Sequence, residues 1–162
     1  MIHSGTTVLL WFNAAGCGLL AGLFFTFSAF AMKALGRMEP SGGIAAMNSI
    51  NETILRSLFM PLFWGTTLAS LGLAAIALSG WNEPAAKSML IGGLVYIFGM
   101  FVCTIAIEVP LNNELARVDP GSDAALPVWQ RYQRRWTGWN HVRTLACLVA
   151  CVLFIQALVE RG

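Results

Sequence analysis

Four long apolar stretches decide what this chain can fold into, and they lie at approximately residues 7–32, 58–80, 88–107 and 142–159. Each approaches the roughly 20 residues that an α-helix needs to cross the hydrocarbon core of a bilayer. In lipid every backbone N–H and C=O must be paired within the protein, which helices achieve, and these stretches lack the alternation of barrel strands. We therefore predict an all-α fold, a polytopic membrane four-helix bundle in which residues 1–162 form a single transmembrane domain.

The composition agrees with insertion into a membrane. Only 11% of the residues are charged, whereas soluble domains carry roughly 25%. The net charge is only +2 and no nucleic-acid-binding motif accompanies it, so we expect membrane lipids as partners and no nucleic acid. The four cysteines all lie in apolar stretches, where free cysteine usually behaves as a small apolar residue.

Basic residues gather in two of the connecting loops. The side with the chain termini holds two, Lys87 and Arg161, and the first and third loops hold seven: Lys33, Arg37, Arg56, Arg117, Arg131, Arg134 and Arg135. Loops rich in Lys and Arg stay in the cytoplasm. We therefore predict an integral protein of the bacterial inner membrane with both termini outside.

Two proline residues and a glycine pair bear on the helices. A helical pattern that begins near Gly42 runs through Pro61, which predicts a kink there. The third span is predicted to end at Pro110. Gly18 and Gly22 form a small-xxx-small pattern, which favours close packing, either within the bundle or in a homo-oligomer.

The segment PVWQRYQRRWTGWNHVRT precedes the last span and has its own periodicity. Its aromatic residues recur at steps of three and four, with arginines beside them. This pattern is typical of an amphipathic interfacial helix that lies at the headgroups with its aromatic side down.

Three polar clusters flank the second, third and fourth spans on the same predicted side of the membrane. In a small bundle the ends of these spans meet, which predicts one shared pocket. The alternative is structural: polar residues at membrane boundaries are common, and Glu108 could simply pair with Arg143 to stabilise a helix end. The clusters are Asn48, Asn51 and Glu52; Glu108, Asn112 and Asn113; and Asn140, His141 and Arg143. Ionisable residues close to membrane depth with partners nearby favour a functional pocket.

The residue types of this predicted pocket bear on three kinds of chemistry. Haem bound by two histidines is disfavoured, because the other histidine, His3, lies on the opposite side of the membrane, and the Glu-x-x-His pairs of di-iron bundles are missing. A single metal ion held by Glu52, Glu108 and His141 is one option. Metal-free proton transfer without a cofactor is the other.

In the metal-free case, His141 would act as the general base and take an acidic C–H proton. Arg143 and Asn112 would stabilise the oxyanion that develops, with Asn140 beside them in the catalytic group. We predict that Asn48, Asn51, Thr104 and Trp139 contact a small lipophilic ligand.

Three stretches together resemble the signature of a known family: GIAAMNSINETI, EVPLNNELA and WQRYQRRWTGWNHVRT. They are similar to the anthrone-oxygenase-like family of small four-span membrane proteins, and the likeness covers nearly the whole chain. The family implies a four-helix membrane bundle. Some of its fungal members oxidise anthrones to anthraquinones, whereas most bacterial members have no assigned reaction.

The resemblance also marks individual positions. Carried over by position, the motif residues are Asn51, Pro110, Asn112, Trp139, Asn140, His141, Arg143 and Thr144. The family motif usually reads NVPLN, and this chain has Glu108 in place of the first Asn. A carboxylate at this position is compatible with a metal ligand, a partner for His141 or a different substrate.

Two functions follow as hypotheses. The first is an oxygenase, without a cofactor or with one metal ion, that oxidises a small phenolic or anthrone-like molecule with O2 and uses His141 as the base. The alternative is a non-enzymatic membrane protein that binds a lipid, a quinone, a metal ion or a partner subunit.

Overall fold

A computed structural model describes residues 2–162, with side chains from residue 4 onward, so that the side chain of His3 lies outside the described part. All regular secondary structure in residues 2–162 is helical, which confirms the predicted all-α fold. Four helical segments are long and apolar enough to cross a membrane: Ser4–Leu35, Phe59–Ser79, Ala86–Ala116 and Ala125–Arg161. The chain is therefore a helical membrane protein, and each of these segments overlaps one of the four apolar stretches.

The described chain contains seven α-helices and three π-helical segments, and the spans are built from six of these α-helices together with the π-helical segments. The first span consists of α1 (Ile2–Thr26), the π-helical turn η1 (Phe27–Ala31) and α2 (Met32–Leu35), and the second is α4 (Phe59–Ser79). The third consists of α5 (Ala86–Tyr96), η2 (Ile97–Val102), η3 (Thr104–Glu108) and α6 (Val109–Ala116), and the fourth is α7 (Ala125–Arg161). The remaining helix, α3 (Pro40–Ile54), lies between the first two spans.

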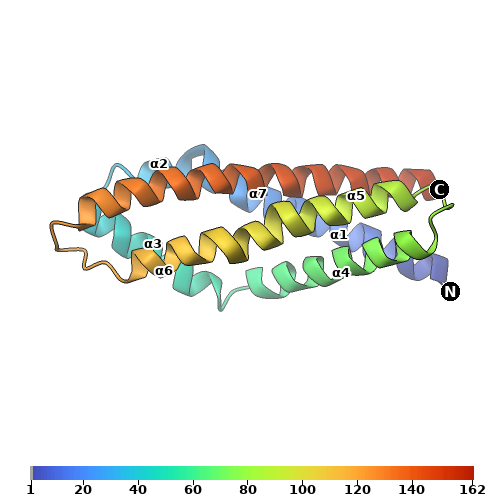
Figure 1. The fold of residues 1–162 in the computed structure, drawn as a ribbon, viewed down its shortest axis with the longest axis horizontal. Helices are drawn as coiled ribbons and strands as arrows, with labels where there is room; N and C mark the ends of the chain where they lie inside the picture. Colours follow the sequence, from blue (N-terminus) through green and yellow to red (C-terminus); the bar gives the residue numbers. More distant parts are fainter. Residues whose placement is uncertain (1) are drawn as a thin grey trace.

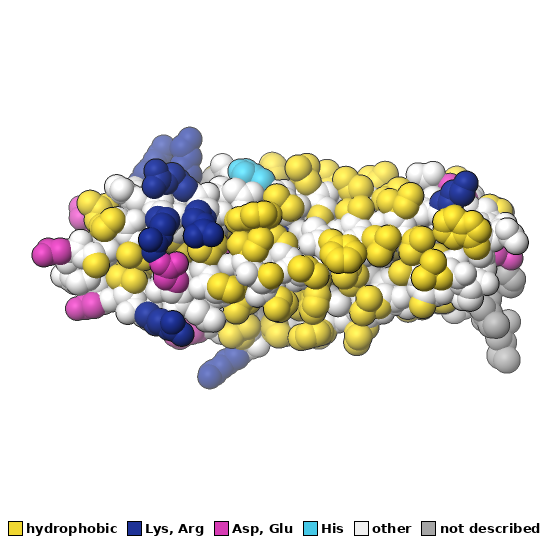
Figure 2. Space-filling view, in the orientation of Figure 1, with side chains coloured by type: hydrophobic (Ala, Val, Ile, Leu, Met, Phe, Trp, Pro, Cys, Tyr) yellow, Lys and Arg dark blue, Asp and Glu magenta, His cyan; other side chains and the backbone are white. Residues whose placement is uncertain are grey.

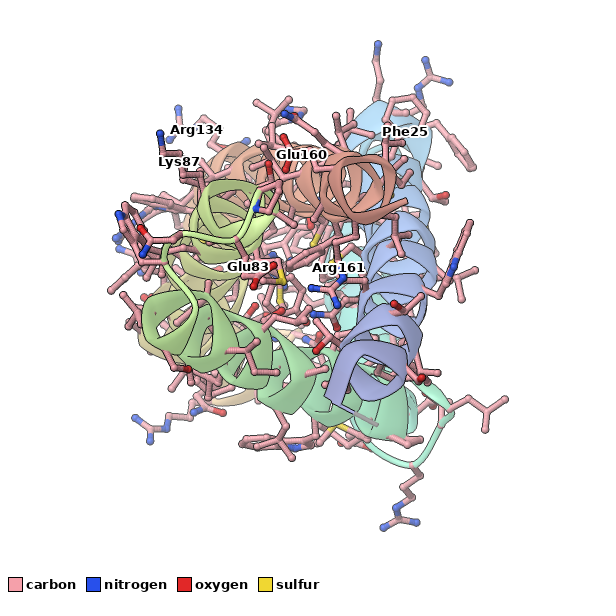
Figure 3. All side chains as sticks on the ribbon, turned by 90° about the vertical axis from the view of Figure 1, so that its right-hand side faces the viewer. Phe25, Glu83, Lys87, Arg134, Glu160 and Arg161 are labelled. Carbon is pink, nitrogen blue, oxygen red and sulfur yellow. The ribbon has the colours of Figure 1, made fainter. Side chains whose placement is uncertain are left out.

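The spans run up and down around a common axis. Helix α1 packs against α4 and α7, and α5 packs against the same two helices. Both termini and the α4–α5 connection lie at one end, whereas α3 and the α6–α7 connection lie at the other (Figure 1). Figure 3 looks onto the end with the termini, where Glu83 and Arg161 lie near the middle and Phe25 points away from the bundle.

Two hydrophobic clusters fill the interior. The first, which we name the bundle core, lies among α1, α4, α5 and α7 and includes Leu20, Phe24, Leu73 and Phe154. The second, the end core, joins α2, α3, α6 and the first part of α7. Its buried members are Met32, Ile44, Met47, Leu111, Leu115, Ala125, Trp129, Tyr132 and Trp136.

The second span differs from its predicted form. Helix α3 ends at Ile54 and α4 begins at Phe59, so the helical structure is interrupted at residues 55–58. The predicted kink at Pro61 is therefore wrong, because the change of direction comes before Pro61. Ser57 supports the break, because its hydroxyl donates to the Ile54 carbonyl at 2.8 Å and accepts from the Phe59 N–H at 3.2 Å. Pro61 falls in the first turn of α4. Backbone N–H groups in the first turn have no acceptor within the helix, so the missing N–H of proline breaks no helical hydrogen bond and causes no bend.

The predicted end of the third span at Pro110 is also wrong. The span continues through α6 to Ala116, and Pro110 occupies the first turn of that helix after η3. Pro110 has no N–H to give to the carbonyl of Ala106, and its ring crowds the preceding turn. Both effects favour the wider turn of the π-helical segment.

The segment before the last span is helical, but its placement at the headgroups as a separate helix needs correction. It is the first part of the continuous helix α7, and Trp129, Tyr132 and Trp136 are only 2–5% exposed. Trp129 stacks on Tyr132 with ring centroids 5.7 Å apart, and Trp136 packs edge-on against Phe27 at 5.5 Å. These aromatic side chains cover the protein's own end core, because α3 and α6 supply an apolar surface for them.

The surface carries a broad apolar zone of the kind that faces lipid in membrane proteins. Figure 2 shows apolar side chains over the middle and the terminal part of the molecule, and Lys and Arg side chains gathered toward the other end. Asn13, Cys17 and Ala21 face inward, whereas Gly18 and Gly22 lie exposed on α1. The four cysteines are free thiols.

The close packing of α5 against α4 at Gly93 predicts that a larger residue there destabilises the fold. A Cβ atom at this position would lie 2.9 Å from the backbone oxygen of Ser70 on α4, whereas one at Gly22 meets nothing within 4 Å. We expect Gly93→Ala to lower the free energy of unfolding by about 1–3 kcal/mol through overpacking. Gly22→Ala should leave it unchanged or raise it by up to about 1 kcal/mol, because alanine is the better helix former. Denaturant unfolding in detergent micelles measures both, and equal effects of the two substitutions would contradict the packing.

Candidate functional site

A cavity of about 290 Å³ lies where the bundle core meets the end core. Its wall comes from α1, η1, α3, the start of α4, η3, α6 and α7, and most of its surface is apolar. The volume is near the lower limit of ligand pockets, which begin at about 300 Å³. It is also roughly twice that of an apolar cavity known to bind benzene, at about 150 Å³. A small fused-ring molecule therefore fits its size.

Glu108 and Arg143 form a buried ion pair in the cavity wall. Their side chains are 1% and 6% exposed, and the Glu108 Oε1 and Arg143 Nη2 atoms are 3.5 Å apart. Arg143 is held further by rings, because its guanidinium carbon lies 4.3 Å from the centroid of Phe24 and 5.2 Å from that of Trp136. Neither oxygen of Glu108 accepts a hydrogen bond from any described residue. The carboxylate is thus buried with one charged neighbour and with capacity to accept a proton or a hydrogen bond.

The π-helical segment η3 places two of the polar side chains. Thr104 and Glu108 are its first and last residues, and both line the cavity. The Thr104 hydroxyl donates to the Met100 carbonyl at 2.7 Å, and Arg143 Nη1 lies 3.5 Å from the same hydroxyl oxygen. A π-helical turn inside an α-helix often marks a functional site, and here it lies beside the ion pair.

Asn140 acts on the site through Arg143. It is completely buried, and its Nδ2 donates to the Phe24 carbonyl and to the Ser28 hydroxyl, both at 2.7 Å. Its Oδ1 accepts from Arg143 Nη2 at 2.7 Å. Asn140 does not line the cavity, which corrects its assignment to the catalytic group: it is a positioning residue that fixes the guanidinium and joins α7 to the first span.

Amide side chains supply further polar groups in the cavity wall. Asn112 of α6 lines it and accepts a hydrogen bond from the Tyr132 hydroxyl at 2.8 Å. Asn48 and Asn51 of α3 also line the cavity. Their Oδ1 and Nδ2 atoms, respectively, are buried without a hydrogen bond to any residue that the structure describes. Buried polar atoms are normally satisfied, so these two atoms favour a ligand with polar groups. That Asn48, Asn51 and Thr104 bind a substrate stays a prediction.

The structure corrects the position of His141. Along a helix successive side chains are rotated by about 100°, so Asn140 and Arg143 point inward while His141 is exposed on the outer face of α7. Trp139 is 39% exposed, and neither residue lines the cavity. A base acting in this cavity is therefore not His141.

The predicted metal ligands are also not assembled. Within the described chain no three His, Cys, Asp or Glu side chains form a group that could hold a metal ion. Glu52 is exposed at the edge of the cavity, Glu108 is buried inside it, and His141 faces outward. The set of Glu52, Glu108 and His141 does not fit a metal site.

Sequence reasoning missed the aromatic part of the site. Phe24, Phe27 and Trp136 line the cavity. Trp136 precedes Asn140 by four residues and Arg143 by seven, which places the three on one helix face. This spacing was a usable signal. Nothing in the sequence of the first span singled out Phe24 and Phe27 from the other apolar residues around them.

A protein-family model described as Anthrone oxygenase matches residues 53–153. The matched part includes η3, α6 and most of α7, and hence Thr104, Glu108, Asn112 and Arg143. No curated protein and no solved structure matches the chain.

The ion pair allows a double-mutant test of burial. Arg143→Met leaves Glu108 as a buried charge without a cation, and we expect it to lower the free energy of unfolding by about 3–5 kcal/mol. Adding Glu108→Gln removes that charge and should restore a large part of the loss. Denaturant unfolding of the single and double variants in detergent measures the coupling. Strictly additive effects would show that the two charges do not interact in the folded protein.

Proposed function

The chain belongs to the anthrone oxygenase family, and on that premise we propose that it is a membrane enzyme that oxidises a small phenolic or anthrone-like molecule with O2. The observation that carries the proposal is a buried carboxylate beside a buried guanidinium in the wall of a mostly apolar cavity of about 290 Å³. Such a cavity suits a planar lipophilic substrate. Both the substrate and O2 partition into membranes, so their local concentrations favour the reaction there.

The chemistry asked of the site is removal of one acidic C–H proton. In an anthrone the methylene carbon between the rings loses a proton to a base, and the negative charge spreads to the ketone oxygen. O2 then forms a bond to this carbon and takes up its electrons, and return of the proton from the base to the peroxide anion gives a hydroperoxide. Loss of water from the hydroperoxide, with the second methylene hydrogen, leaves the new carbonyl. One molecule of O2 is consumed, and one of its oxygen atoms remains in the product.

Glu108 is the base in this proposal. It lies in the cavity wall, and its carboxylate oxygens accept no hydrogen bond from the described residues. General bases contribute about 10²–10⁴-fold to rate. Glu108 takes over the role that the sequence had suggested for His141.

Arg143 stabilises the oxyanion. Its Nε donates to no described residue, and a positive group fixed in advance by Asn140, Phe24 and Trp136 gains most where water is excluded. Asn112 and Thr104 offer further polar contacts on the same wall. These residues bind and orient the substrate while Glu108 holds the proton.

A non-enzymatic function is the second candidate. The buried amide atoms of Asn48 and Asn51 suit reversible binding of a quinone or a lipid equally well. In that case the cavity would bind an anthraquinone and no O2 would be consumed with an anthrone.

We also propose the orientation of the protein. The basic loops at the end with α3 support a cytoplasmic location for the cavity, with both termini on the opposite side of a bacterial inner membrane (Figure 2). A homo-oligomer through the exposed Gly18 and Gly22 stays a prediction.

O2 uptake by the purified protein in liposomes tests the function. With anthrone as substrate, we expect Glu108→Gln to lower the rate by about 10²–10⁴-fold, because the amide cannot accept the proton. His141→Ala is the matched control and should keep the wild-type rate, since His141 lies outside the cavity. A fully active Glu108→Gln protein would exclude Glu108 as the base. A wild-type protein that binds anthraquinone without consuming O2 would favour the second candidate.

A further inference from the structure

The mouth of the cavity can be located from the exposure of its lining residues. Those on α1, η1 and α7 are buried or half-buried, and the exposed ones come from two helices. They are Glu52 on α3 and Leu55 directly after its end, and Val109, Asn113 and Ala116 on α6. The two helices are in contact and lie side by side at the same end of the molecule (Figure 1). The cavity therefore opens sideways, between α3 and α6.

The α6 side of this mouth changes from apolar to charged along the helix. Ile105, Val109, Asn113 and Arg117 follow one another at steps of four, and all four are exposed. At about 1.5 Å per residue they span roughly 18 Å. The sequence of two aliphatic side chains, one amide and one cation matches the passage from hydrocarbon through the headgroups into water.

The α3 side shows the same gradient. Glu52 is exposed, and three residues later Leu55 is 62% exposed at the break before α4. Leu58, at the end of the break, is 87% exposed. Two leucines exposed to water would be unfavourable, whereas lipid acyl chains solvate them. The apolar parts of both rims, Leu55 and Val109, thus lie toward the spans, and Glu52 and Asn113 lie toward the basic end.

We propose that the cavity is filled from the bilayer, by a neutral lipophilic aromatic molecule that passes between Leu55 and Val109 at the headgroup boundary. The ligand's identity rests on the proposed function, whereas the direction of access does not. Leu55 and Val109, between which the ligand passes, are uncharged and give an anion no partner. The ligand therefore arrives uncharged, and an anion formed inside is retained next to Arg143.

Spin labels at the rim test the direction of access. Leu55→Cys and Val109→Cys are labelled with a nitroxide in liposomes, and collisions with O2, which concentrates in hydrocarbon, are compared with those of a water-soluble nickel chelate. Arg117→Cys is the reference for water. We expect the ratio of O2 to nickel collisions at positions 55 and 109 to exceed that at position 117 by several-fold. Labelling of the native cysteines, of which three are buried, sets the background.

A second spin-label experiment tests whether a ligand enters the cavity between Leu55 and Val109. Ile105 and Leu58 are exposed neighbours that do not line the cavity, so Ile105→Cys and Leu58→Cys are matched controls. Anthraquinone added to the liposomes should immobilise the labels at positions 55 and 109 and leave those at 58 and 105 unchanged. Nickel-dominated collisions at 55 and 109, or no selective immobilisation there, would overturn the proposal. O2 uptake is measured separately, so a lateral mouth on an inactive protein would count against the proposed function alone.

Discussion

Glu108 and Arg143 lie 3.5 Å apart and almost completely out of solvent, at the point where the bundle core meets the end core. Removing two charges from water costs several kcal/mol per ion, so the surroundings must compensate both. They do so unequally. Asn140, Phe24 and Trp136 all contact the guanidinium, whereas the carboxylate accepts no hydrogen bond from the described residues. This asymmetry gives the site one fixed cation and one group that is ready to accept a proton or a hydrogen bond.

The cavity exists because two packing units meet without filling the space between them. The spans form the bundle core, while α3, α6 and the first part of α7 form the end core. The break at residues 55–58 separates α3 from α4, and the π-helical segments η1 and η3 both contribute residues to the cavity wall. A straight helix through either region would carry different side chains to this position. The irregular backbone is thus what brings Thr104 and Glu108 to one wall.

The spans were predictable from the sequence because length and hydropathy report directly on membrane helices. The meeting of Asn51, Glu108 and Arg143 also followed, since each lies at the same end of a span. Single-residue roles did not follow. The motif WNHVRT suggested that His141 and Arg143 act together, yet a rotation of about 100° per residue sends them to opposite faces of α7. Aromatic residues at helical spacing face protein instead of lipid only where another part of the chain packs against them. For Trp136 that part is Phe27 in the first span, far away in the sequence. The effects of the prolines depended on where helices begin, which is decided by packing.

Photo-crosslinking with a benzophenone-type ketone in liposomes tests the central claim most directly, because the excited ketone inserts into C–H bonds that it touches. Mass spectrometry of the digested protein then identifies the modified residues. The cavity predicts modification of Met47, Ile54 and Phe59, suppressed by excess anthraquinone. Modification confined to residues on the outer surface of the spans, and unaffected by anthraquinone, would contradict the claim that this cavity binds a lipophilic aromatic molecule.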